Sequence, residues 1–158
     1  MLDDHAEELA ADLALWSVGE LTTVEVIRMA CDALVSGLDS QSLRELAGAS
    51  ERTSEYEIED LLERVAVDFG LEFYARDSLE GRLAASRVLA RECVAGRLEP
   101  REFARWMHTR IRHGYEDVGI ETLVSKDDKY DVRELMGNPV DDIDRQVLNA
   151  AERLLGST

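Results

Sequence analysis

The sequence predicts an all-α protein, a compact bundle of six to seven amphipathic helices. Apolar residues recur with the 3.6-residue period of a helix, glycines follow the ends of the periodic segments, and no stretch alternates as a strand does. The chain has 158 residues, of which 45% are apolar and 33% charged, which suits one folded domain with its own core. We therefore expect a single helical domain over 1–158, with a less regular segment at about 115–139.

The first three helices are expected at about 3–18, 22–36 and 40–47, each followed by a glycine. Thr22-x-x-Glu25 has the spacing of a capping box at the start of the second helix. The apolar spacing of that helix predicts a buried face made of Val24, Ile27, Cys31, Leu34 and Val35.

Ser54-x-x-Glu57 predicts the start of a fourth helix and Asp77-x-x-Glu80 the start of a fifth, each as a capping box. Pro100 suits the first turn of a sixth helix, which we expect to close at Gly114. Between 115 and 139 the pattern weakens into a polar run at 126–131, with short helical turns expected near 120–124 and 132–136. The last helix, at about 140–155, repeats apolar residues at near-heptad spacing: Ile143, Val147, Ala150 and Leu154.

Charge is distributed unevenly along the chain. The net charge is −16, yet the segment 77–114 holds eight arginines against five acids. A strongly acidic chain repels nucleic acid and anionic lipid, so neither is an expected partner. No apolar run is long enough to span a membrane, and the first residues lack the basic region of a secretory signal, which favours a cytoplasmic location.

The basic segment contains one helix face on which Arg101, Arg105, His108 and Arg112 follow each other at spacings of four, three and four. Arginine forks suit phosphate or carboxylate, so this face could hold an anionic ligand or an acidic partner. The alternative is that these side chains are solvated or pair with acids of the same chain.

An acidic surface is expected on the fourth helix, carried by Glu55, Glu59, Asp60 and Glu63. Such a surface can steer a basic partner, as an immunity or antidote protein steers a basic toxin. The alternative is that the charge only keeps the protein in solution.

The sequence offers little support for a metal, a cofactor or an active site. His108 and His113 are five residues apart, and the aspartates at 127, 128 and 131 lack the glycine and glutamate of a calcium loop. No nucleophile motif or phosphate-binding loop is present. Cys31 and Cys93 both lie on apolar helix faces, which predicts buried, unpaired thiols. We therefore expect no metal and no cofactor, and a non-enzymatic role is favoured.

The stretch from Gly37 to Gly48, GLDSQSLRELAG, resembles a segment of small uncharacterised helical proteins of high-GC bacteria, and that resemblance implies no activity. The sequence as a whole favours a small soluble protein-interaction module that binds a basic partner through its acidic helix. The alternative is an enzyme or ligand-binding domain that holds a phosphate or carboxylate on the Arg/His face. A homodimer built from surplus apolar helix faces also stays open.

Overall fold

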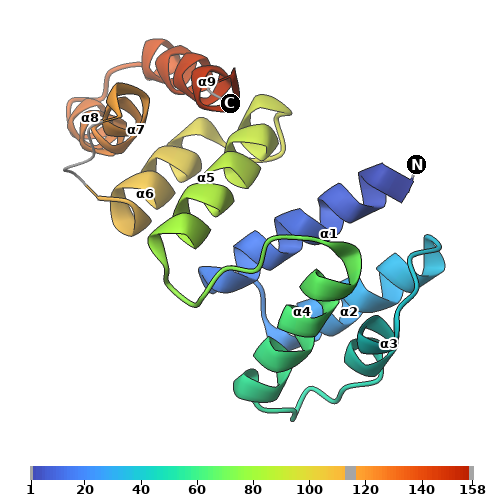
Figure 1. The fold of residues 1–158 in the computed structure, drawn as a ribbon. Helices are drawn as coiled ribbons and strands as arrows, with labels where there is room; N and C mark the ends of the chain where they lie inside the picture. Colours follow the sequence, from blue (N-terminus) through green and yellow to red (C-terminus); the bar gives the residue numbers. More distant parts are fainter. Residues whose placement is uncertain (1, 113–116, 157–158) are drawn as a thin grey trace. The chain divides into compact units, whose positions relative to one another are not determined.

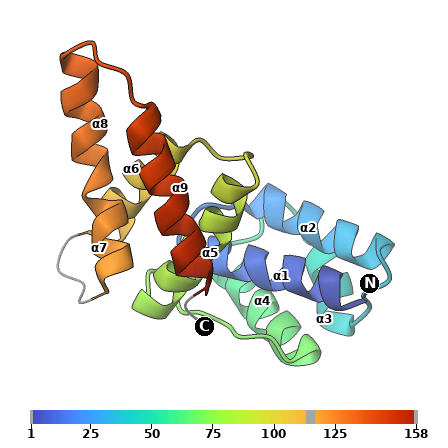
Figure 2. The same cartoon turned by 90° about the horizontal axis from the view of Figure 1, so that it is seen from above.

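A computed structural model describes residues 2–112 and 117–156, and all of the regular structure in these ranges is helical (Figures 1 and 2). The helices are α1 (Leu2–Ser17), α2 (Thr23–Val35), α3 (Gln41–Ala47), α4 (Glu55–Phe69), α5 (Leu79–Val94), α6 (Pro100–Arg110), α7 (Val118–Val124), α8 (Lys126–Leu135) and α9 (Asp141–Gly156). The all-α prediction is confirmed, although the helices outnumber the six or seven expected. The chain divides into two compact units, residues 1–85 and 86–158, while the prediction of one domain stays a prediction.

The first unit is built on the mutual packing of α1, α2, α3 and α4. α3 packs between α2 and α4, and α1 contacts both α2 and α4. The loop after α4 is attached to α1 by Arg76, whose guanidinium lies 4.6 Å from the centre of the Trp16 ring and donates to the Trp16 carbonyl at 2.9 Å. The core consists of apolar side chains from all four helices: Leu9, Leu13, Trp16, Val26, Ala30, Leu43, Leu46, Ile58, Leu62 and Val65.

Two of the three predicted capping boxes are confirmed. Thr22 accepts from the Glu25 amide while the Glu25 carboxylate accepts from the Thr22 amide, and Ser54 and Glu57 repeat this arrangement at α4. The box predicted at Asp77 is wrong, because α5 begins two residues later. The hydroxyl of Ser78 accepts from the amide three residues on, at 3.1 Å, and so takes the capping role.

The buried face predicted for α2 is wrong in part. Val26 and Ala30 are fully buried, whereas Val35 is 89% exposed and Cys31 is also exposed. Nine of the thirteen positions of this helix are apolar, so the sequence allows more than one buried face. The packing selects the face that carries alanine, which lets α2 approach its neighbours closely.

The second unit gathers around α6, which contacts α7, α8 and α9. Its core includes Phe103, Met107, Leu123, Tyr130, Ile143 and Val147, all of them buried. The predicted apolar repeat of the last helix is confirmed, since Ile143, Val147, Ala150 and Leu154 are all buried in α9.

The irregular segment predicted at 115–139 is largely helical. α7 covers the first expected turn, but α8 begins at Lys126 and includes the whole polar run, for which the sequence predicts no helix. The closing glycine proposed for the sixth helix, Gly114, lies outside the described residues. Within the described ranges, no helix is long and apolar enough to cross a membrane.

Candidate functional site

The predicted basic face of α6 lies against α8 and is paired with its acids. An Nη2 nitrogen of Arg101 lies 3.2 Å from an Asp131 oxygen and 2.5 Å from a Glu134 oxygen. At the other end of α6, His108 Nδ1 lies 3.0 Å from an Asp127 oxygen. The beginning of α6 thus meets the end of α8 and the reverse, so the two helices run antiparallel.

The pairing extends along both helices in matching steps. Arg101, Arg105 and His108 are spaced by four and three residues, as are Asp127, Asp131 and Glu134 on α8. Arg105 completes the series with its Nε 3.9 Å from an Asp127 oxygen. The Arg101 hydrogen bond lowers the pKa of Glu134 below its ordinary value, so that carboxylate is ionised near neutral pH. We call this set of ion pairs the α6–α8 ladder.

Arg112 is not part of the ladder. It follows the end of α6 with a left-handed backbone, φ 67°, and its amide donates to the Met107 carbonyl at 3.2 Å. Its side chain is exposed. The structure therefore joins three of the four predicted basic residues and leaves the fourth apart from them.

Two buried polar atoms of the ladder have no hydrogen-bond partner among the described residues: Arg101 Nε and Asp127 Oδ1. Asp127 is the more enclosed acid, with 13% of its side chain exposed, and it lies between Arg105 and His108. An anionic ligand on this face has to displace carboxylates that already hold the cations.

Three of the four acids predicted on α4, Glu55, Asp60 and Glu63, are exposed, whereas Glu59 is partly buried. Tyr56, Asp60, Glu63 and Val67 are exposed and follow at steps of four, three and four, which is one stripe of the helix. Asp60 pairs with Arg64 of the same helix at 3.3 Å, and neighbouring Glu55 pairs with Arg76 at 2.9 Å. Among the described residues, Glu59 and Glu63 form no ion pair, so they are the carboxylates left for a partner.

The side of α8 that faces α9 carries polar contacts that no sequence pattern predicts. Lys126 donates to the Gln146 side-chain oxygen, the Tyr130 hydroxyl donates to Asp144 at 2.6 Å, and Arg133 bridges to Asp142. Burial and the Asp144 hydrogen bond raise the pKa of Tyr130, so this phenol stays protonated. One sequence signal could have pointed here, because Lys126 and its neighbour Lys129 are the only lysines of the chain.

An exposed apolar patch lies at the end of α8. Val132, Leu135 and Met136 share one side of the chain there, and Leu135 is 90% exposed. Surfaces of this kind are used for association between proteins, including self-association.

No group of described histidine, cysteine, aspartate or glutamate side chains is arranged to hold a metal ion. Asp127 and Asp131, which suggested a calcium loop, lie within a helix and belong to the ladder. His113, the other histidine considered as a ligand, lies outside the described residues.

Comparison with known proteins adds no homologue to this description. No protein-family model matches the chain, no curated protein is significantly similar to it, and no solved structure matches it significantly.

Proposed function

We propose that the protein is a small non-enzymatic interaction module that binds a basic partner protein through the exposed stripe of α4. The observation that supports this best is the composition of the stripe. Tyr56 is 81% exposed at one end and Val67 76% exposed at the other, with Asp60 and Glu63 between them. We call these four residues together with Glu59 the α4 face.

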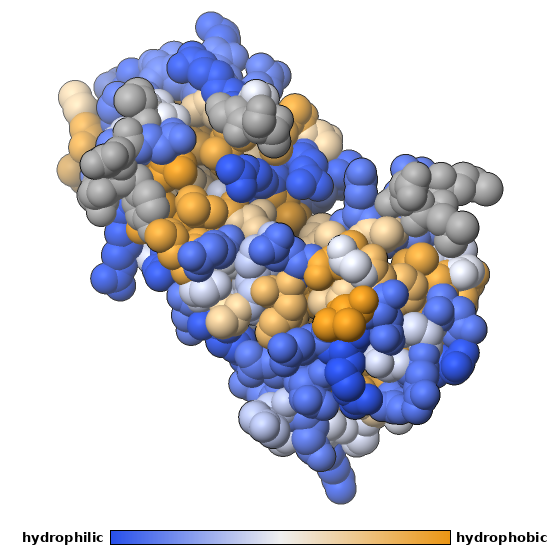
Figure 3. Space-filling view, viewed as in Figure 1, coloured by the Kyte–Doolittle hydropathy of each residue, from blue (hydrophilic) through white to orange (hydrophobic). Residues whose placement is uncertain are grey.

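The chemistry of the α4 face suits a partner that carries arginine or lysine beside an apolar contact. α4 holds six acids and one arginine, so its local field is strongly negative and would speed the approach of a positive surface. Exposed tyrosine is a common anchor of protein interfaces, because it buries a large ring at a small entropy cost. In the view of Figure 3, the surface over α3 and α4 is mainly hydrophilic with isolated apolar residues.

The side of α4 opposite the α4 face is buried, which holds the helix in place. Ile58, Leu62 and Val65 are fully buried in the first unit, and a complete capping box fixes the first turn. A rigid helix loses little conformational entropy when a partner binds, which favours affinity. An immunity or antidote role is the special case in which the partner is a basic toxin.

A cytoplasmic location is part of the same proposal. Both cysteines are unpaired and Cys31 is exposed, as suits a reducing compartment.

Site-specific photo-crosslinking tests the proposal. A photoreactive phenylalanine derivative replaces Tyr56, and the crosslinked partner is identified from lysate of the native host. We expect one partner with a basic surface, and its capture should fall steeply as salt rises, because the contact is electrostatic.

A charge-matched pair of variants provides the control. Glu59→Gln with Glu63→Gln removes two carboxylates of the α4 face, whereas Glu7→Gln with Glu152→Gln removes two exposed carboxylates from α1 and α9. Only the first pair should weaken binding, by roughly ten-fold or more, since loss of one charged contact costs about 1.5–3 kcal/mol. Equal effects of the two pairs, or a partner whose capture does not depend on salt, would refute the proposal.

A further inference from the structure

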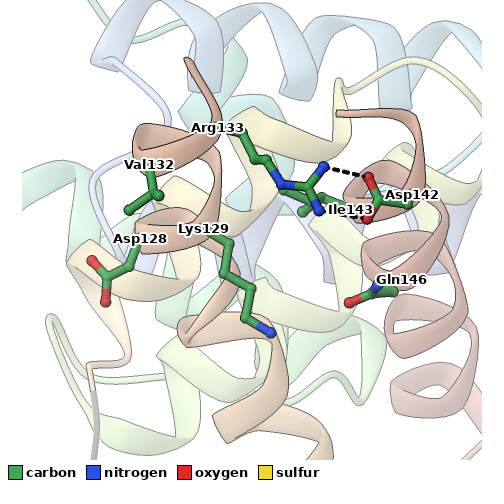
Figure 4. A pocket seen from close by; sticks show the side chains of 7 residues that line it. All are labelled: Asp128, Lys129, Val132, Arg133, Asp142, Ile143 and Gln146. Atoms are coloured by element: carbon green, nitrogen blue, oxygen red, sulfur yellow. Dashed lines mark hydrogen bonds and ion pairs between the residues drawn. The ribbon is translucent and has the colours of Figure 1, made fainter. Parts of the chain in front are cut away.

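A cavity of about 380 Å³ lies between α8 and α9. Its lining includes no residue of the α4 face and none of the α6–α8 ladder. Its polar lining comes from Asp128, Lys129 and Arg133 of α8 and from Asp142 and Gln146 of α9, and Val132 and Ile143 supply apolar wall. Figure 4 shows Lys129 extending from α8 toward the α9 side of this space. The volume is that of a site for a small molecule.

The four charged side chains of the lining, Asp128, Lys129, Arg133 and Asp142, sum to zero, but they are not evenly paired. Arg133 and Asp142 neutralise each other through two hydrogen bonds, at 3.0 and 2.9 Å. Asp128 points away from α9 in Figure 4, and one of its oxygens lies 3.9 Å from His108. Lys129 forms no ion pair within the described residues, so its ammonium is the cation available at the cavity.

A second ammonium lies just behind this lining. Lys126 is only 6% exposed, and its Nζ donates to the side-chain oxygen of Gln146. Burial and the neighbouring Lys129 lower the pKa of Lys126, and the charge of Asp142, whose carboxylate is already paired with Arg133, offsets this only in part. A buried ammonium held by one neutral amide keeps two unused N–H donors, which is costly unless an anion approaches.

The Lys126 contact also fixes how Gln146 is oriented. An ammonium can only donate, so the amide oxygen of Gln146 must face it. The two N–H donors of that amide have no acceptor among the described residues and remain available at the cavity. An ammonium, an amide and a second ammonium behind them form a donor set for several anionic oxygens.

We propose that the cavity between α8 and α9 binds a small organic anion, with its carboxylate or phosphate held by Lys129 and Gln146 and balanced by Lys126. The apolar wall favours an anion that carries a compact apolar body. This site differs from the Arg/His face, whose cations already have carboxylate partners, and it does not depend on the α4 face.

The two lysines make the test direct. Protein labelled only at lysine gives two side-chain signals by nuclear magnetic resonance, one for Lys126 and one for Lys129. Phenyl phosphate and benzoate are titrated as separate probes, with benzyl alcohol as the neutral control. We expect one of the anions to move both signals saturably and to raise the pKa of Lys126, because a bound anion stabilises the ammonium form. The stronger probe identifies the ligand as phosphate-like or carboxylate-like.

Two variants of equal charge change distinguish the cavity from general attraction. Lys129→Gln removes the available ammonium and should weaken anion binding roughly ten-fold or more, because hydrogen bonds to charged groups are the strong ones. Arg145→Gln removes an exposed charge from α9, one residue before Gln146, without changing the lining of the cavity, and should leave binding unchanged.

A third variant, Gln146→Glu, supplies a carboxylate of the chain itself next to Lys126. It should abolish anion binding while the protein stays folded. The proposal is overturned if neither anion moves the lysine signals, if benzyl alcohol moves them as much, or if Lys129→Gln and Arg145→Gln weaken binding equally.

Discussion

Replacement of Asp12 by asparagine should stabilise the protein, and the gain should depend on pH. Asp12 lies on α1, partly buried, and burial followed by the charges of Glu8 and Asp32 raises its pKa from 3.8 to about 6. The folded protein therefore retains this proton at pH values where the unfolded chain has released it. Stability falls as pH rises from about 3.8 to about 6, and the full penalty is present above that window.

The size of the effect follows from the shift. Each pKa unit corresponds to about 1.4 kcal/mol, so a shift of about two units sets a ceiling of about 3 kcal/mol. Solvent still reaches part of this side chain and screens its charge, so about 1–2 kcal/mol is the expected gain for Asp12→Asn near neutral pH. Well below pH 3.8 the group at this position is neutral in both the folded and the unfolded chain, and the difference should vanish.

Urea unfolding followed by tryptophan fluorescence measures this gain. Trp16 belongs to the first unit and Trp106 to the second, so a Trp106→Phe background isolates the unit that contains Asp12. Glu7→Gln serves as the control, because it removes the same charge from an exposed position of α1. A stability difference that stays constant from pH 4 to pH 7 would refute the reasoning, as would a carboxyl titration of Asp12 centred near 3.8.

Three further outcomes are expected. Asp127→Asn should destabilise the second unit by about 1–2 kcal/mol, because it removes the enclosed acid of the α6–α8 ladder. Asp128→Asn changes an exposed pair and should alter the free energy of unfolding, measured in urea, by less than about 0.5 kcal/mol. A thiol reagent should modify exposed Cys31 in the folded protein and reach buried Cys93 only after denaturation, because burial raises the pKa of the Cys93 thiol to about 11. Mass spectrometry counts the labels, and two labels on the native protein would contradict this expectation. Gly81→Ala should cost about 1–3 kcal/mol, because the added Cβ would collide with a serine hydroxyl of α1, and an unchanged melting temperature would show that the contact relaxes freely.

Local signals in the sequence predicted the parts of the fold that depend on neighbouring residues. The capping boxes at Thr22 and Ser54 form as expected, because their hydrogen bonds join residues three apart. The apolar repeat predicted for the last helix is buried in α9 as expected, because the polar and apolar positions of this helix are clearly separated. The face of α2 could not be predicted in the same way, because most of its positions are apolar and its neighbours decide which ones are buried.

The α6–α8 ladder depends on contacts between residues far apart in the sequence, and the sequence pattern identifies only the basic members of these pairs. The spacing of Arg101, Arg105 and His108 correctly placed them on one helix face, but their acids lie 19 to 33 positions further on. The polar run at 126–131 gave no helical signal because its stabilising partners are the cations of α6 and the polar groups of α9. A helix with charged residues on two sides has no apolar stripe strong enough to recognise.

The scarcity of lysine has a practical consequence for work with this protein. Reagents that react with amines have only two side chains to attack, and Lys126 is almost fully enclosed. Acylating dyes, amine crosslinkers and carboxyl-activated sensor chips will therefore attach mainly through Lys129 or the chain's terminal amine. Attachment at Lys129 would occupy the α8–α9 cavity itself, so immobilisation through an introduced cysteine or an affinity tag is the better choice for binding measurements.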